Sequence, residues 1–309
     1  MTPHELKAAL IRKARKLGFL DVRMARAEKM EAEAVRLQEW LQKGYHGEME
    51  YMENHFEKRT DPTLLVPGAR TVICLAFNYY TEADQEDPDA PRISKYAYGR
   101  DYHKVLKTKL KRLYTFVREL DESIEGRYFV DSAPVLERDW ARRSGLGWMG
   151  KNTMIIHPKR GSYFFLSELI LNVELPPDDP IQDYCGTCTR CIEACPTDAI
   201  LDSGYQMDGS KCISYLTIEL KSAIPGKFKG KMENYIFGCD ICQEVCPWNR
   251  FSTPHDEPDF EPTKELLEMT EQDWKNLTEE EFEELFRGSA VKRAKFSGIK
   301  RNIDFCNNQ

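Results

Sequence analysis

The chain has 309 residues and a formal charge of −7, with 41% hydrophobic and 31% charged residues. This length allows two or three packed units, and the composition is typical of a soluble globular protein. No apolar run approaches the ~20 residues that a membrane-spanning helix needs, and the N-terminus lacks the apolar core and cleavage site of a signal peptide. We therefore expect a cytoplasmic protein, a monomer without membrane contact, whose thiols stay reduced unless they bind metal.

The N-terminal part mixes helical and strand patterns. In chain order they indicate a helix, a strand, a helix, a short strand and two more strands, at residues 1–19, 70–80, 104–120, 127–130, 152–158 and 162–175. A further helix should begin near Pro134 with Ser132 as its N-cap. This mixed α/β pattern suggests a cofactor-binding domain, but neither GxGxxG nor GxxxxGK[ST] is present, so simple dinucleotide and nucleoside-triphosphate sites lack support.

Eight of the ten cysteines lie between residues 185 and 246, in two groups that each end in Cys-Pro. Paired CxxC units can bind zinc. The CxxCxxCxxxCP run starting at Cys185 instead matches the bacterial ferredoxin pattern, in which the fourth cysteine ligates the other cluster. On that rule the first [4Fe–4S] cluster takes Cys185, Cys188, Cys191 and Cys246.

The second cluster takes Cys239, Cys242 and Cys195, and it still needs a fourth ligand. A plain repeat would place that ligand three residues before Cys239, where Ile236 stands. Cys212 is the only cysteine left in this region, so we assign it. The eight cysteines then fill two four-cysteine sites. This predicts a short electron-transfer chain that ends at an acceptor in the N-terminal part.

The chain resembles the epoxyqueuosine reductase family along most of its length. The resemblance rests on segments in the same order as in that family: "EKRTDP", "YGRDYHKVL", "VDSAPVLERDWARRSGLGWMGKNT", "GSYFFLSELI", "CGTCTRCIEACPTDAI", "CISYLT" and "GCDICQEVCPWN". Such enzymes remove the epoxide oxygen of epoxyqueuosine in tRNA, the last step of queuosine biosynthesis. The resemblance implies an oxidoreductase that uses cobalamin, as cob(II)alamin, together with two [4Fe–4S] clusters.

The resemblance also implies a domain division: a cobalamin-binding catalytic domain at 1–175, a two-cluster ferredoxin-like domain at 176–255 and a helical extension at 256–309. Many family members continue into HEAT-like helical repeats, which this sequence does not include. The corrinoid signature D-x-H-x-x-G is absent, since "DYHKVL" has leucine where the glycine would stand. Cobalamin is therefore expected from the resemblance alone.

Asp131 is the predicted catalytic acid, because it matches the acid of the family's motif and follows a predicted strand. Donating a proton near neutral pH calls for a raised carboxyl pKa, which burial or a nearby negative charge would provide. The alternative is a plain helix cap. His103 follows Asp101 at an expected helix start, where capping and polar packing compete with a functional role.

The remaining predicted cofactor contacts carry over from the family by position. Arg59 would use its fork of donors on a propionamide or phosphate, and its alternative is a surface arginine. The other positions are Ser94, Tyr96, Asn152, Ile155, His157, Leu166, Ser214, Gly238 and Asp240, together with Asp131. Ordinary strand packing is the alternative for those at 152–166.

Three basic runs, at 104–112, 221–231 and 292–301, make an RNA-facing surface plausible despite the negative net charge. The expected partners are the anticodon arm of tRNA carrying epoxyqueuosine and an external electron donor. Two alternatives stay open. One is another corrinoid iron–sulfur reductase such as a reductive dehalogenase, although no twin-arginine signal is visible; the other is a plain electron-transfer protein, which would not need the N-terminal domain.

Overall fold

The structure is a computed structural model that describes residues 1–307. Its N-terminal part is built on a four-stranded antiparallel sheet in the order β1-β2-β7-β4. The bounds are β1 (Asp21–Arg26), β2 (Thr71–Asn78), β4 (Gly126–Phe129) and β7 (Phe164–Leu171). The two central strands are buried almost throughout, which explains their near-continuous apolar sequence.

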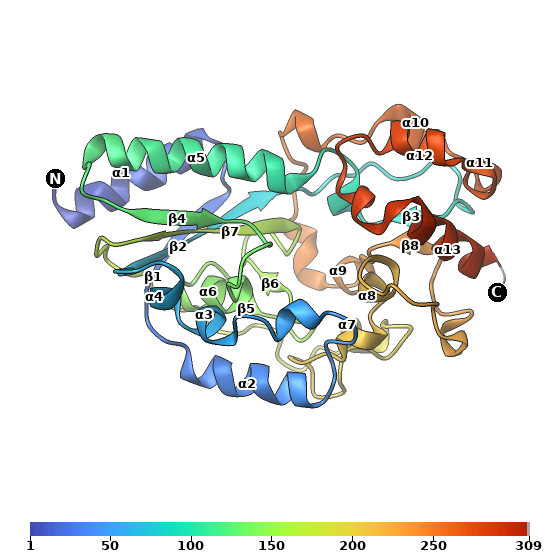
Figure 1. The fold of residues 1–309 in the computed structure, drawn as a ribbon, viewed down its shortest axis with the longest axis horizontal. Helices are drawn as coiled ribbons and strands as arrows, with labels where there is room; N and C mark the ends of the chain where they lie inside the picture. Colours follow the sequence, from blue (N-terminus) through green and yellow to red (C-terminus); the bar gives the residue numbers. More distant parts are fainter. Residues whose placement is uncertain (308–309) are drawn as a thin grey trace.

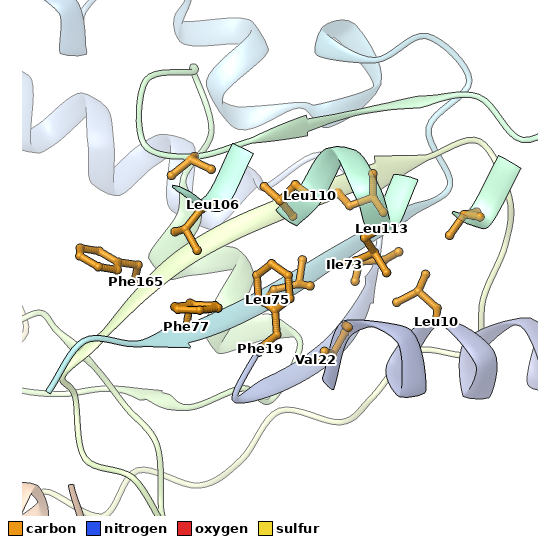
Figure 2. Close-up of a cluster of buried hydrophobic side chains, with 14 of the residues drawn as sticks. Leu10, Phe19, Val22, Ile73, Leu75, Phe77, Leu106, Leu110, Leu113 and Phe165 are labelled. Atoms are coloured by element: carbon orange, nitrogen blue, oxygen red, sulfur yellow. The ribbon is translucent and has the colours of Figure 1, made fainter. Parts of the chain in front are cut away.

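Two long helices, α1 (Pro3–Lys16) and α5 (Tyr102–Leu120), cover one face of this sheet (Figure 1). The apolar stripe of α5, with Leu106, Leu110 and Leu113 each fully buried, packs on Ile73 and Leu75 of β2 (Figure 2). Each such side chain contributes roughly 1.5–3 kcal/mol when it leaves water. The charged side of the helix stays outside, so the 3.6-residue pattern alone orients α5.

The other face carries shorter elements (Figure 1). They are the helices α2 (Glu31–Gln42), α3 (Phe56–Thr60), α4 (Pro62–Leu65) and α6 (Glu137–Arg143), and the hairpin of β5 (Trp148–Met149) and β6 (Ile155–Ile156). Trp140 of α6 is buried against Val72 and Cys74 of β2 in a core of its own. The sheet therefore has cores on both faces.

A separate core holds the C-terminal part. The elements are α7 (Arg190–Glu193), α8 (Ile213–Ile218), β8 (Tyr235–Phe237), α9 (Ile241–Glu244), α10 (Lys264–Glu268), α11 (Glu271–Asn276), α12 (Glu279–Leu285) and α13 (Lys295–Asn307). β8 pairs in parallel with β3 (Arg92–Ile93), so the chain before α5 also enters this core. Buried Trp274, Phe282 and Phe286 pack the tail helices against β8.

Short 3₁₀ turns complete the chain at η1 (Glu50–Met52), η2 (Lys95–Ala97), η3 (Gly209–Lys211), η4 (Gly226–Phe228), η5 (Pro247–Phe251), η6 (Pro258–Phe260) and η7 (Ala290–Ala294). The predicted mixed fold and its main strands and helices are confirmed. The domain boundaries after residues 175 and 255 stay a prediction. No helix within residues 1–307 is long and apolar enough to cross a membrane.

One local prediction was wrong. The helix expected near Pro134 begins only at Glu137, and Leu136 is its N-cap residue, without a side-chain cap bond. Ser132 makes no cap either; its hydroxyl donates to the carbonyl of Val130. The intervening residues form tight turns, because the amides of Ser132 and Val135 bond carbonyls only two residues back. The segment from Asp131 to Leu136 is therefore a loop, and Asp131 caps no helix.

Candidate active site and cluster-binding cysteines

The four cysteines predicted for the first cluster come together. Cys185, Cys188, Cys191 and Cys246 all line one small cavity of about 80 Å³. Lys151 closes one side by donating from Nζ to the carbonyls of Gly186 (2.8 Å) and Cys188 (3.0 Å). The charges of Cys185 and Cys246, after burial, raise the pKa of the Cys191 thiol to about 11. Cys246, which comes from the second group of cysteines, thus lies beside the loop that carries Cys185, Cys188 and Cys191.

The other four cysteines also neighbour one another. Burial first, and then the charges of Cys239, Cys212, Cys191 and Cys195, raise the pKa of Cys242 well above its usual range. The Cys195 sulfur accepts a hydrogen bond from the amide of Ala199, which lies on the far side of the turn that begins at Pro196. Within residues 1–307 no three acidic, cysteine or histidine side chains converge tightly enough to hold a single metal ion. The first set lines a cavity instead.

The second set of cysteines lies beside the predicted cofactor contacts. Asp240, directly after Cys239, is buried and accepts hydrogen bonds from the Ser94 hydroxyl and, at 2.8 Å, from the Lys95 amide. Burial raises the pKa of Asp240 to about 6 despite these bonds. Gly238 has φ +71°, and a Cβ there would lie 2.5 Å from the Ser94 Cβ. Only glycine allows this close approach.

Asn152 and Ser214 also touch this part of the molecule. Buried Asn152 donates from Nδ2 to the carbonyl of Cys242 at 3.2 Å. Ser214 hydrogen-bonds to the Cys212 thiol through its backbone and side chain, which lowers the pKa of that thiol against the larger effect of burial. Both predicted positions thus contact cysteines of the second set.

Asp131 lies at the end of β4, facing the N-terminus of α5. Its carboxylate oxygen Oδ2 accepts from the Tyr102 hydroxyl at 2.9 Å and lies 3.1 Å from His103 Nε2. The other ring nitrogen of His103 is 2.7 Å from Asp101 Oδ1. The imidazole therefore bridges two carboxylates. Asp101 also accepts from the His103 amide, so the predicted cap and the polar site share one residue.

The backbone of Asp131 has φ +55°, in the left-handed region that non-glycine residues adopt uncommonly, with asparagine and aspartate the most frequent among them. Its amide donates to Glu137 Oε1 at 2.6 Å, across the loop to the first turn of α6. Strain of this kind persists only where surrounding contacts hold it, and it is concentrated at functional sites.

The expected raised pKa of Asp131 is wrong for this arrangement. Its side chain is 53% exposed, and the partial desolvation that raises the pKa of that carboxyl is outweighed by the hydrogen bonds from His103 and Tyr102 and by the His103 charge, which lower it. The proton sits on the histidine: burial lowers the His103 pKa, yet the bonds to Asp101 and Asp131 raise it to about 9. The ready proton near neutral pH is thus one hydrogen bond away from Asp131.

Arg59 is a buried residue of α3, which rules out the surface-arginine interpretation. Its Nη2 donates to the Tyr51 carbonyl at 2.8 Å, while its Nε is buried without any partner. Burial lowers the Arg59 pKa, and no carboxylate within residues 1–307 forms an ion pair with the guanidinium. A buried donor without a partner is costly, so a polar ligand group would complete this site.

The remaining predicted contacts differ in their surroundings. Tyr96 is near Tyr102, Phe165 and Phe237, with ring centroids 6.1–6.4 Å apart, close to the Asp131 group. Ile155 and Leu166 pack in the core that surrounds Trp140, as the strand-packing alternative expected. His157 lies 3.4 Å from Asp21 at the start of β1.

Three residues of the Asp131 environment escaped prediction. Tyr102 stacks on Phe165 with centroids 4.1 Å apart, which aims its hydroxyl at Asp131. Glu137 holds the loop, and the positive charge of Arg293 from η7 lowers the Asp131 pKa. Tyr102 stood beside His103 in a quoted motif; nothing in the sequence marks Arg293, because only folding brings the tail here.

The basic runs are only partly available at the surface. In the tail run, Arg301 donates to the carbonyls of Leu216, Leu220 and Ser222, and Lys292 pairs with Glu283. Arg293 forms a two-bond ion pair with Glu219. In the α5 run, Lys107 reaches the Ser132 hydroxyl at 3.4 Å, beside Asp131. The run on α5 thus borders the site, and much of the tail run serves the fold.

Cysteine loops beside a polar, strained carboxylate site define an iron–sulfur oxidoreductase. Residues 184–249 match a family model described as a 4Fe-4S double cluster binding domain, and residues 59–132 match one described as epoxyqueuosine reductase QueG. An epoxyqueuosine reductase of Cellulophaga algicola is 54% identical over 97% of this chain and 96% of its own.

Two solved structures are also similar. A crystal structure of epoxyqueuosine reductase with an epoxyqueuosine-modified tRNA-Tyr stem loop has a TM-score of 0.89 at 33% identity, covering 99% of this chain and 81% of that one. The enzyme from Bacillus subtilis, with its aspartate catalytic loop swung out of the active site, has a TM-score of 0.90 at 32% identity, covering 99% and 82%. The chain belongs to the epoxyqueuosine reductase family. The predictions of an oxidoreductase and of two [4Fe–4S] clusters are confirmed.

Proposed function

We propose that this protein reduces epoxyqueuosine to queuosine in the anticodon arm of tRNA, with Asp131 delivering the proton. The observation that carries the proposal is the Asp131 carboxylate held between Tyr102 and His103, in a chain of this family. Opening the epoxide to an alkene consumes two electrons and two protons and releases one water. The chain must therefore bring an electron route and a proton route to one place.

We propose cobalamin as the acceptor of the electrons. The residues present fit a large flat cofactor with a polar rim: Arg59 offers a buried donor without a partner, and Gly238 lets the backbone of the cluster loop approach closely. Arg59, Ser94, Tyr96, Asn152, Ser214, Gly238 and Asp240 would hold it. When bound, cobalamin supplies a cobalt centre for two-electron or radical chemistry. Ile155, Leu166 and His157 are weaker candidates, since core packing or Asp21 already engages them.

The proton route follows from the pKa order at the site. His103 is protonated at neutral pH because Asp101 and Asp131 both stabilise its charge. As negative charge develops on the epoxide oxygen, the His103 proton moves along the 3.1 Å contact to the Asp131 carboxylate, and Asp131 passes it on to that oxygen, which leaves His103 neutral. Tyr102 keeps the carboxylate pointed at the site. The strained loop can move, as in the Bacillus subtilis relative whose catalytic loop is swung out.

The electron route uses the two cysteine sets in sequence. We propose Cys185, Cys188, Cys191 and Cys246 as ligands of the outer cluster, and Cys195, Cys212, Cys239 and Cys242 as ligands of the inner one. The inner set adjoins Asp240, which directly follows Cys239, and Asn152 bonds the Cys242 carbonyl. A cleft of about 900 Å³ borders Cys246 and is lined by Lys95, Arg190 and Arg250 among others. An external electron donor would approach the outer cluster there.

For the RNA, support comes from the relative solved with a modified tRNA stem loop and from the lysines of α5 beside the Asp131 loop. The modified nucleotide must leave its stack to reach Asp131, and phosphate contacts would make binding salt-dependent. A cytoplasmic monomer with domains divided after residues 175 and 255 is part of the same proposal.

The test is to purify the chain without oxygen, reconstitute iron, sulfide and cobalamin, and incubate it with a reductant and an epoxyqueuosine-containing tRNA stem loop. Mass spectrometry of the nucleosides should show queuosine in a cobalamin-dependent yield. Conversion without cobalamin would refute its role. No conversion by protein carrying both clusters and cobalamin would refute the proposed substrate.

A further inference from the structure

Glu168 is an acidic residue in the middle of an apolar strand. It stands on β7 between Cys74 of β2 and Phe129 of β4, and it is fully buried. Its neighbours along the strand, Ser167 and Leu169, are both fully buried. Neither carboxyl oxygen receives a hydrogen bond from a donor within residues 1–307. An unpaired buried carboxylate would cost far more than the sheet can offset, so Glu168 must be neutral.

The partner of Glu168 is Glu137, the residue that holds the Asp131 amide. The two carboxyl groups lie within reach of a mutual hydrogen bond, and within residues 1–307 no other donor reaches either Glu168 oxygen. Because a carboxylate has no proton to donate, this bond requires a proton between the two groups. One oxygen of Glu137, Oε1, meanwhile accepts from the Asp131 amide at 2.6 Å. The contacts thus run from the centre of the sheet through two carboxyls to the strained loop.

We propose that Glu137 and Glu168 form a proton-sharing pair that positions Asp131, with Glu137 holding the loop amide and Glu168 holding Glu137. Glu137 is a positioning residue: it touches the backbone of Asp131 and not its carboxylate partners Tyr102 and His103. The pair supplies the support that the left-handed backbone of Asp131 requires. This role rests on the function proposed above.

The pair should respond to pH. Burial and the Asp131 charge raise the pKa of Glu137 to about 8, and burial and the Glu137 charge raise that of Glu168 well above its usual range. The titratable groups facing the pair are Asp131 on the loop, Tyr102 and His103 on α5 and the buried Cys74 thiol on β2. Below pH 8 the pair is neutral. Above it, a carboxylate forms against Asp131, and the repulsion favours an outward loop.

Four variants test this role. Glu137→Ala removes the acceptor, Glu137→Gln keeps an acceptor oxygen without titrating, and Glu168→Gln keeps a donor to Glu137. Glu33→Gln is the matched control, because Glu33 is a buried glutamate that is paired with Arg142 and Arg143 away from Asp131. The readouts are amide hydrogen exchange of a peptide spanning 129–137 and the pH profile of stem-loop conversion.

Glu137→Ala should speed exchange at the loop at least about tenfold and lower kcat by a similar factor, with KM for the stem loop unchanged. Glu137→Gln should retain most activity and move the alkaline decline from about pH 8 towards about 9, where His103 loses its proton. Glu168→Gln should stay within about threefold of wild type, as expected of one neutral hydrogen bond that is kept. Glu33→Gln should leave the loop exchange and the pH profile unchanged.

The positioning role is overturned if loop exchange in Glu137→Ala equals that of wild type, or if the alkaline limb of Glu137→Gln stays where wild type has it. Exchange is measured without substrate. A wild type that converts no stem loop would therefore sink the proposed function, while the exchange data would still decide whether Glu137 holds the loop.

Discussion

The cluster region and the Asp131 site are built in opposite ways. Seven of the eight proposed cluster cysteines lie in two short runs, 185–195 and 239–246, so spacing along the chain already brings most of each proposed set together. The Asp131 site draws His103 from α5, Glu137 from α6 and Arg293 from η7. A local motif tolerates changes elsewhere in the fold, whereas an assembled site depends on every element that delivers a residue.

The largest effect is expected where the cluster region departs from a local motif, at Cys212. Cys212→Ala should lose the inner cluster, so iron and sulfide per chain fall by about half, and conversion falls at least ~1000-fold because the electron route is cut. Cys306→Ala is the control, since Cys306 is buried in the tail core and bonds the Tyr235 carbonyl. Full iron content in Cys212→Ala would show that the inner set has another fourth ligand.

The second largest effect is expected from a substitution in the Asp131 site that leaves the cluster region intact. Asp131→Asn should lower kcat by about 100-fold or more, the usual size of a lost general acid, and retain both clusters and cobalamin. Absorption spectra check the cofactors, and nucleoside analysis checks turnover. Asp121→Asn should convert normally, because Asp121 is exposed and its carboxylate, among residues 1–307, bonds only Ser123. Unchanged turnover in Asp131→Asn would remove Asp131 from the mechanism.

The protonation of His103 should make the activity of Asp131 depend on pH. The pKa of His103 is raised to about 9. The stability that its charge contributes to the folded protein is therefore fully present below about pH 6.5, its unfolded pKa, and is lost as pH rises through 9. Over that same rise, His103 of the folded protein loses the proton that it would supply to Asp131. His103→Gln should lower kcat about tenfold and abolish the part of the alkaline decline that centres on pH 9. A pH profile that matches wild type between 8 and 10 would show that the His103 proton is not used.

The smallest effect concerns the tail. Arg301→Ala should lower the free energy of unfolding by about 1–3 kcal/mol, because it leaves carbonyls of Leu216, Leu220 and Ser222 without their donor. Lys292→Ala removes a largely exposed ion pair and should cost less than about 1 kcal/mol. Chemical denaturation measures both. Equal stability of the two variants would show that Arg301 is not a structural part of the cluster region.

Sequence patterns were sufficient for regular elements and for ligands close together in the chain. The stripe of α5 predicted its buried face, and the strand at 70–80 is β2 within two residues at either end. The cysteine spacing predicted two clusters. These predictions succeed because helix and strand periodicity and the CxxCxxC loop are properties of neighbouring residues.

The start of α6 and the pKa of Asp131 were predicted wrongly for one reason. Both depend on how the Asp131 loop folds, and that loop is held by Glu137 and His103 rather than by its own sequence. The prediction of a helix N-terminus at Ser132 and Pro134 used only local sequence preferences. Glu168 left a usable signal, a lone acid inside the apolar run of β7, but its partner could not be named without the sheet.

By itself, the sequence determined the mixed fold, the two-cluster count and the family, because each is written in short-range patterns and contiguous motifs. Only the tertiary structure decided which protonation states surround Asp131. A pKa depends on desolvation and on nearby charges and hydrogen bonds, and here His103, Tyr102 and Arg293 supply them, which only the fold brings to Asp131.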